Sequence, residues 1–284
     1  MADYLLLGKV RLSFSVVFSA IAGYLLGAET IVWAEVFLLS IGGMLVVMAS
    51  NGFNQILEKD RDGYMERTKN RPLPALRMSV ANAFVFSAIA MLIGLSFLYL
   101  INPLSAFFGG LSIFIYVLVY TPLKAYSPLA VFVGAIPGAI PFMLGWVAAT
   151  NSFGIESGAL FALQFLWQFP HFWAIAWLVY NDYAKAGYYL LPTRKKDELS
   201  ALLAIVYTIW MIVLSVFPYL GLTGDLHLSL PSTIIVVILG LFMLYKAIAM
   251  YKGKTEKDAK KLMLASILYL TFMQVVFVVD KMIV

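Results

Sequence analysis

The sequence predicts an all-α membrane protein, a bundle of about nine transmembrane helices with a polar cavity that faces the cytoplasm. Hydrophobic residues make up 62% of the chain and charged residues 12%, whereas soluble proteins average roughly 45–50% and about 25%. The apolar residues are gathered in runs of roughly 20, the length of helix that crosses a hydrocarbon core of about 30 Å. The charged residues lie mostly in the segments between these runs.

Nine runs are expected to span the membrane, and in chain order they cover residues 9–28, 32–56, 79–100, 104–122, 128–149, 158–180, 199–220, 230–250 and 262–283. The first two precede a highly charged segment, and the next two separate that segment from Lys124. The fifth and sixth end at a second basic segment, and the seventh and eighth end at a lysine-rich segment before the last run. Pro103 and Pro122 bracket the fourth run, which is the shortest, because proline lacks the amide donor of a helix interior. Residues 1–284 are therefore expected to form a single membrane domain.

The basic residues test this helix count, because an odd number of spans places the termini on opposite sides and cytoplasmic loops are rich in Lys and Arg. With the N-terminus inside, 19 of the 20 Lys and Arg residues fall on the inner side and only Lys281 falls outside. The net charge of +5 thus reflects orientation in the lipid bilayer and does not imply nucleic acid. The first run is interpreted as a retained helix, which favours a multi-pass protein of a prokaryotic plasma (inner) membrane with its C-terminus outside.

A charged segment follows the second run, NQILEKDRDGYMERTKNRPLP at residues 54–74. Asn54, Glu58 and Asp62 are spaced four residues apart, so they share one face if the helix continues as far as the prolines. Carboxylates are costly inside a membrane, so this face is expected at the edge of a polar cavity. Mg²⁺ is usually held by one or two carboxylates together with substrate phosphates, and cations bind the phosphate oxygens. The cations that follow are Arg67, Lys69 and Arg71.

A second polar cluster lies at the inner end of the sixth run, LWQFPHFWAIAWLVYNDYAKAGYYLLPTRKK. The residues beyond the run are Asp182, Lys185 and Arg194, and the segment VYTPLKAYSP adds Tyr120 and Lys124 on the same side. Acidic groups from two helices with cations between them suit a metal-bound pyrophosphate better than a single salt bridge. His171 lies within the run, where a structural role and a ligand contact are both open. The chain has no cysteine, which excludes thiolate nucleophiles and cysteine-ligated metals.

These motifs resemble the UbiA-type superfamily of intramembrane prenyltransferases, whose signature is an Asn-x-x-x-Asp-x-x-x-Asp run followed by Arg and Asn-Arg-Pro. Within the superfamily they are most similar to the branch of protohaem IX farnesyltransferases. The similar segments are ERTKNRPLP, YTPLK, VGAIPGAIPFMLGW and WQFPHFWAIAW, in an order that extends over nearly the whole chain. Two departures are that Glu58 stands where Asp is commoner and that AGYYLLP stands where Ala-Gly-Ile-Pro-Met-Leu-Pro is more usual.

The resemblance implies a role for each matching residue. The implied metal ligands are Asn54, Glu58, Asp62 and Asp182, the last three of which are also the implied catalytic residues. The implied diphosphate-binding residues are Arg11, Arg67, Lys69, Arg71, Tyr120, Lys124, Lys185 and Arg194. The implied haem contacts are His171 and Trp167.

The resemblance also implies a reaction, the Mg²⁺-dependent transfer of a farnesyl group from farnesyl diphosphate to a vinyl group of haem b with addition of water, giving haem O and diphosphate. Haem b is then a substrate and not a cofactor, and a haem A synthase or an oxidase-assembly factor is an expected partner. Two alternatives are open. One is prenylation of a quinone precursor or a chlorophyllide at the same metal site. The other is cation-coupled transport, which the clustering of the acids at one membrane face and the lack of an internal repeat disfavour.

Overall fold

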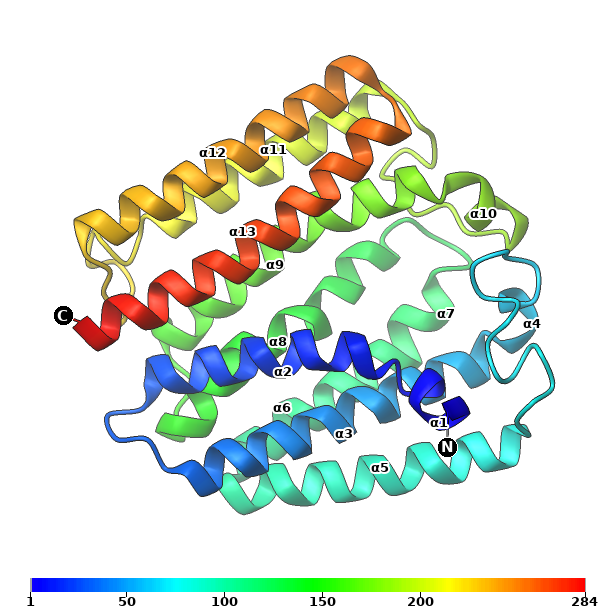
Figure 1. The fold of residues 1–284 in the computed structure, drawn as a ribbon, viewed down its shortest axis with the longest axis horizontal. Coiled ribbons are helices and arrows are strands. Elements are labelled where there is room, and N and C mark those ends of the chain that lie inside the picture. Colours follow the sequence, from blue (N-terminus) through cyan, green and yellow to red (C-terminus); the bar gives the residue numbers. More distant parts are fainter. Residues whose placement is uncertain (1, 284) are drawn as a thin grey trace.

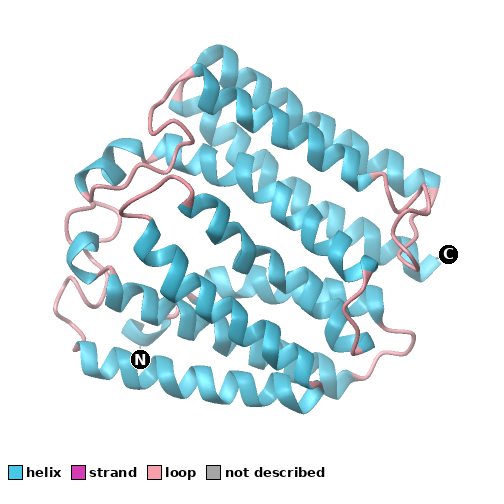
Figure 2. Ribbon diagram, turned by 180° about the vertical axis from the view of Figure 1, so that it is seen from behind, coloured by secondary structure: helices cyan, strands magenta, loops and turns pink. Residues whose placement is uncertain are grey.

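The computed structural model describes residues 2–283, and in that part of the chain every regular element is a helix (Figures 1 and 2). In chain order the elements are α1 (Ala2–Leu7), α2 (Val10–Gly27), α3 (Trp33–Leu57), α4 (Lys59–Asp62), α5 (Val80–Ile101), α6 (Pro103–Phe114), η1 (Ile115–Tyr120), α7 (Thr121–Leu123), α8 (Ala130–Thr150), α9 (Ile155–Leu178), α10 (Tyr180–Lys185), α11 (Glu198–Ser215), α12 (Leu230–Gly253) and α13 (Glu256–Ile283). The long helices run side by side, and their connecting loops gather at two opposite ends (Figure 2).

The predicted bundle of about nine membrane-spanning helices is confirmed within residues 2–283. Eight helices are long and apolar enough to cross a membrane, with α6, η1 and α7 together forming one of them. The ninth is α9, whose 24 residues are long enough but include Gln164, Gln168 and His171, which make it less apolar. Each of the nine coincides with one of the predicted runs.

The structure corrects the path predicted after the second span. α3 ends just before Glu58, whose backbone is not helical (φ −98°, ψ 4°), and α4 is a single turn. The expectation that the helix continues to the prolines is wrong, because the chain leaves the helix at Asp62 and residues 63–79 form turns. The Thr68 hydroxyl donates to the Asp62 carbonyl at 2.8 Å, so a side chain takes an acceptor that a further helical turn would have used.

The fourth span contains a π-helical segment that the sequence did not predict. The span begins at Pro103, in the first turn of α6. Proline is favoured there because the backbone N–H that it lacks would have no partner within the helix. In η1 the spacing of the hydrogen bonds widens, and the Thr121 N–H donates to the Tyr116 carbonyl five residues back. Such segments are rare and often lie at functional sites.

The helices pack as two groups joined through α2, α8 and α9. One group consists of α2, α3, α5, α6 and α8, and the other of α9, α11, α12 and α13. The joint between α2 and α8 depends on small residues that allow the two backbones to approach closely. A Cβ on Gly23 would lie 2.0 Å from the Phe142 carbonyl oxygen, and one on Gly145 would lie 1.9 Å from the Ala20 carbonyl oxygen.

We expect Gly145→Ala to lower the melting temperature of the purified protein, because the added methyl would overlap backbone atoms of α2 that have no room to move. Overpacking of this kind costs about 1–3 kcal/mol. Gly110→Ala is the matched control, since a Cβ there meets nothing within 4 Å. Thermal unfolding in detergent measures both variants, and equal melting temperatures would contradict the close α2–α8 contact.

Candidate active site

The polar site lies at the end of the bundle where α4, α7 and α10 gather, the same end as the N-terminus (Figure 1). Asn54 comes from the last turn of α3, Glu58 from the break that follows, and Asp62 from α4. The Glu58 N–H donates to the Asn54 carbonyl at 3.0 Å, and the Asp62 N–H donates to the Glu58 carbonyl at 2.8 Å. These two bonds preserve helical spacing across the break, so the three side chains stay in one row. All three are buried, with 1%, 5% and 0% exposure respectively.

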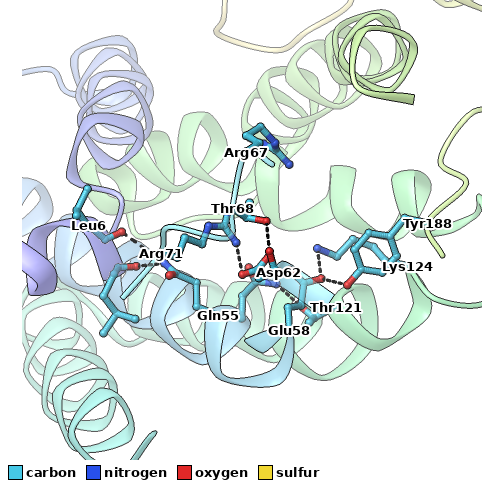
Figure 3. Close-up of polar contacts among 12 residues, drawn as sticks. Leu6, Gln55, Glu58, Asp62, Arg67, Thr68, Arg71, Thr121, Lys124 and Tyr188 are labelled. Carbon is cyan, nitrogen blue, oxygen red and sulfur yellow. Dashed lines mark hydrogen bonds and ion pairs between the residues drawn. The ribbon is translucent and has the colours of Figure 1, made fainter. Parts of the chain in front are cut away.

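Each carboxylate has a cation on one of its oxygens (Figure 3). Arg71 Nη1 lies 2.5 Å from Asp62 Oδ2. Lys124 pairs with Glu58 Oε1, and the Tyr188 hydroxyl donates to the same oxygen at 3.0 Å. Breaking a buried pair of this kind is costly because it leaves one charge without a partner.

The row also presents three oxygens that have no hydrogen-bond partner among residues 2–283. Asp62 Oδ1 is fully buried and unpaired. Glu58 Oε2 is unpaired because both of its neighbours use Oε1. The third is the amide oxygen of Asn54, whose Nδ2 donates to Thr121 Oγ1 at 3.0 Å.

The free oxygens fit a divalent cation better than they fit a closed salt-bridge network. A buried acceptor without a donor is unfavourable unless something else binds it. Two carboxylate oxygens and one amide oxygen are hard ligands of the kind that Mg²⁺ and Ca²⁺ take. Within residues 2–283 no three Asp, Glu or His side chains form a metal site by themselves. A cation here would therefore need further ligands from phosphate or water, as Mg²⁺ usually has.

The two carboxyl groups have opposite pKa shifts. Burial alone would raise the pKa of Glu58, but the charge of Lys124 and the hydrogen bonds from Lys124 and Tyr188 outweigh it and lower this pKa below its usual value. Burial also raises the pKa of Asp62, and the charge and hydrogen bond of Arg71 offset it only in part. Glu58 is therefore the more readily ionised of the two groups. A bound cation would have its larger effect on Asp62, because it would favour the charged form that burial disfavours.

Among residues 2–283, the contacts of Asp182 are with the loop after α4 and with Lys185, and none is with Asn54, Glu58 or Asp62. Asp182 accepts hydrogen bonds from the backbone N–H of Glu66 at 2.8 Å and of Arg67 at 3.3 Å, and Lys185 Nζ lies 3.8 Å from it. It thus fastens the loop after α4 to α10. Both of its oxygens bind backbone amides, and its role as a metal ligand stays a prediction.

The predicted diphosphate-binding residues divide into two sets. Arg71 and Lys124 contact the acidic row, and the Tyr120 ring lies 4.9 Å from Lys124 Nζ. The other five make their contacts outside the row. Arg67 covers the Tyr183 ring, Lys69 pairs with the exposed Glu66, Lys185 lies near Glu66, Arg194 donates to the Tyr126 carbonyl, and Arg11 is exposed on α2.

Sequence reasoning missed three residues of the site, Lys9, Thr121 and Tyr188. Lys9 has a left-handed backbone (φ 49°) between α1 and α2 and is half-buried. Burial, and then the charges of Arg71 and Lys124, lower the pKa of Lys9 to about 7. The sequence signal for Lys9 was obscured, because a Lys at the start of a span is expected as a topological anchor. Tyr188 is the first Tyr of the unusual segment AGYYLLP, and only the fold shows that it reaches Glu58.

His171 and Trp167 lie one helical turn apart on α9, and both contact Ser266 on α13. Their rings stack with centroids 4.7 Å apart. His171 Nδ1 lies 2.7 Å from Ser266 Oγ on α13, and Trp167 Nε1 donates to the Ser266 carbonyl at 2.6 Å. The Ser266 hydroxyl itself donates to the Met263 carbonyl, so it accepts from His171 and leaves Nε2 as the unprotonated nitrogen.

These features define a class of protein, a multi-pass helical membrane protein with a buried polar site at one end. The acidic row of that site suits a divalent cation, and the cations beside it suit a diphosphate. Comparison with known sequences then gives the family. The sequence model of the UbiA prenyltransferase family matches residues 16–273, and the chain belongs to this family.

The relatives extend over the whole chain. A protoheme IX farnesyltransferase of Christiangramia forsetii is 56% identical over 100% of this chain and 94% of its own length. One of Flavobacterium psychrophilum is 55% identical over 98% and 94%. Among solved structures, a digeranylgeranylglyceryl phosphate synthase has a TM-score of 0.82 at 21% identity, covering 100% of this chain and 99% of its own. A UbiA homologue of Archaeoglobus fulgidus, described as bound to DMAPP and Mg²⁺, has a TM-score of 0.70 at 14% identity, covering 97% and 99%. At these identities the structures show the shared fold.

Proposed function

We propose that this protein is a protohaem IX farnesyltransferase, which transfers the farnesyl group of farnesyl diphosphate to a vinyl group of haem b. The observation that carries the proposal is the row of free oxygens on Asn54, Glu58 and Asp62 beside fixed cations, which suits an allylic diphosphate. The acceptor is inferred from relatives at 52–56% identity over nearly the full chain that bear this name.

Mg²⁺ is the cation that we propose for the row, with Asn54, Glu58 and Asp62 as its protein ligands and Asp182 as a further acidic group of the site. The A. fulgidus homologue described with Mg²⁺ and an allylic diphosphate supports this choice. When bound, Mg²⁺ would neutralise charge that develops on the departing diphosphate. The acidic row of this chain would hold that cation, and its buried position would keep the electrostatic interactions strong.

The cations of the chain bind the diphosphate itself. Lys124 and Arg71 already contact the acidic row. Lys9 is a further amine near them, whose pKa of about 7 a bound diphosphate would raise and so favour its charged form. Arg is suited to paired contacts with phosphate oxygens, and Lys acts as a point charge. The cations at the edge, with Arg11 on α2, contribute to attracting the substrate. Together they stabilise the leaving group as its C–O bond breaks.

The reaction then proceeds by attack on an allylic cation. The vinyl group of haem b supplies the electron pair for the new C–C bond, and the positive charge moves to the vinyl carbon next to the ring. Water adds to that carbon and loses a proton, which gives haem O and diphosphate. Aromatic rings beside the site, including Tyr120, shield the cation from early hydrolysis and stabilise it through their faces.

Incubation of purified protein with haem b and a panel of prenyl diphosphates tests the proposal. We expect one product, with the mass of haem b plus a farnesyl group and a hydroxyl group, formed only with Mg²⁺ present. Prenylation of an aromatic acid in place of haem would leave the family assignment intact and reject the proposed acceptor.

We expect His171→Ala to shift the absorbance of bound haem and reduce product formation while farnesyl diphosphate binding stays near the wild-type level. The reason is that Ser266 fixes the proton on Nδ1, which leaves Nε2 available to haem iron or to a bound water. Optical titration with haem b measures the effect. Unchanged spectra and turnover would make His171 a structural residue.

We expect reporter fusions to place the N-terminus in the cytoplasm and the C-terminus outside, because 19 of the 20 basic residues then lie on the inner side. The polar site would face the cytoplasm, where farnesyl diphosphate is dissolved. Activity of the same reporter at both termini would reject this orientation. An association with a haem A synthase or an oxidase-assembly factor stays a prediction.

A further inference from the structure

Two neutral residues form hydrogen bonds to side chains of the acidic row. They differ in this from Arg71 and Lys124, which carry a charge. Thr121 contacts Asn54. Tyr188 contacts Glu58 (Figure 3). Both are almost completely buried, with 4% and 2% exposure. These hydroxyls are neutral and out of contact with solvent, so their presence needs another reason, which their hydrogen bonds supply.

Thr121 determines which way the Asn54 amide points. The Thr121 hydroxyl has one hydrogen, which it donates to the Tyr116 carbonyl at 2.7 Å. It must therefore accept from Asn54 at 3.0 Å, and only the NH₂ end of the amide can donate. The amide oxygen is consequently turned away from Thr121 and left free. The π-helical spacing of η1 contributes to this arrangement, since it stacks Thr121 over Tyr116.

Tyr188 does the same for Glu58. Its hydroxyl donates to Oε1 at 3.0 Å, which leaves Oε2 as the free oxygen. Lys124 uses Oε1 as well, but its flexible stem can turn toward a phosphate. Apart from Lys124, the Tyr188 ring is held by packing against Met65 and Ala186 and by Arg61, whose guanidinium lies 5.4 Å from the ring centre. Tyr188 therefore remains on Oε1 when the lysine leaves.

We propose that Thr121 and Tyr188 are positioning residues, which orient the oxygens of Asn54 and Glu58 toward the divalent cation that binds with the diphosphate. The proposal rests on the proposed function only for the presence of that cation. Hydrogen-bonding partners of metal ligands typically contribute 10–100-fold to metal affinity. Loss of either hydroxyl thus weakens metal binding while the ligands themselves stay in place.

The test measures metal binding directly, with Mn²⁺ followed by electron paramagnetic resonance in the presence of a non-reacting thio-analogue of farnesyl diphosphate. We expect Thr121→Val and Tyr188→Phe each to weaken Mn²⁺ binding by about 10-fold. Thr121→Ser restores a hydroxyl at the same place and should bind Mn²⁺ at close to the wild-type affinity. Thr208→Val is the matched control, because that buried hydroxyl bonds only the Ala204 carbonyl of its own helix.

Each result decides the matter. Mn²⁺ affinity within twofold of wild type in both folded variants would overturn the proposal, and so would an equal loss in Thr208→Val. If a variant unfolds, as judged by thermal unfolding in detergent, Thr121→Ser and the partner variant still give the comparison. Should the wild type fail to farnesylate haem b yet bind Mn²⁺ in a Thr121-dependent way, the proposed function fails and this inference stands.

Discussion

Asp62→Asn is expected to lower turnover by at least about 100-fold, the scale of losing one electrostatic group that acts in a transition state. Asn keeps the shape of Asp but removes the negative charge. Its amide has one neutral oxygen, which is a weaker ligand for the cation than a carboxylate oxygen. The wild-type Oδ1 is buried and has no partner, so its contribution is made only when a ligand is bound. The loss should therefore appear mainly in kcat and in the Mg²⁺ dependence.

Asp60→Asn is the control for this substitution, because it removes an equal charge from the same short helix at an exposed position. Steady-state assays at several Mg²⁺ concentrations measure both variants, and thermal unfolding verifies that both fold. Wild-type turnover and Mg²⁺ dependence in Asp62→Asn would show that the row on α3 and α4 is not the metal site.

Lys124→Met is expected to cost both substrate binding and stability. It removes the cation that pairs with a carboxylate of 5% exposure, and breaking a buried pair in this way costs about 3–5 kcal/mol. The KM for farnesyl diphosphate should rise as well, because Lys124 is one of the cations that face the site. Thermal unfolding and steady-state kinetics measure the two effects separately.

The double variant Lys124→Met/Glu58→Gln separates the two effects. Removal of both charges should recover most of the lost stability, since no buried charge is left unpaired, while activity stays low. A double variant no more stable than Lys124→Met would show that the pair is not what stabilises this end of the bundle.

The stability loss of Lys124→Met should also depend on pH. In the wild type the pKa of Glu58 is lowered, so its contribution to stability is present above the unfolded value of about 4.3 and is lost as pH falls through the folded pKa. In the variant, burial without the cation raises this pKa, so the folded state must hold a costly charge at high pH. The difference in melting temperature from wild type should be larger at pH 8 than at pH 5.

The sequence by itself determined the helical membrane fold, because spans of about 20 apolar residues have few alternatives in a bilayer. All nine predicted runs became long helices, and most of their ends lie within a few residues of the predicted positions. α13 begins at Glu256, earlier than the predicted 262. α11 ends at Ser215, earlier than the predicted 220, as the chain turns ahead of Pro218. The helix after α3 stops at Asp62, where contacts of the following loop replace its next turn.

The sequence also predicted the acidic row and two of its cations, because the spacing and charge of these residues can be read directly from the chain. Asn54, Glu58, Asp62, Arg71 and Lys124 do meet in the folded chain. Charge alone could not separate them from Arg67, Lys69 or Arg194, which carry the same charge but are directed to the edge of the site. Which cation enters the site depends on helix rotation and loop path, and neither is encoded in local spacing.

Only the tertiary structure decided how the ligand oxygens are oriented. Thr121 and Tyr188 lie 67 and 130 residues from the groups they contact, and neither charge nor spacing marks a neutral Thr or Tyr in an apolar chain as a partner of the acidic row. Their importance comes from burial, because a hydrogen bond that water would replace at the surface has no substitute inside the bundle. The sequence thus specified which charged groups gather at one end of the helices, and the packing of η1, α7 and the loop after α10 decided which oxygen of each ligand is left free.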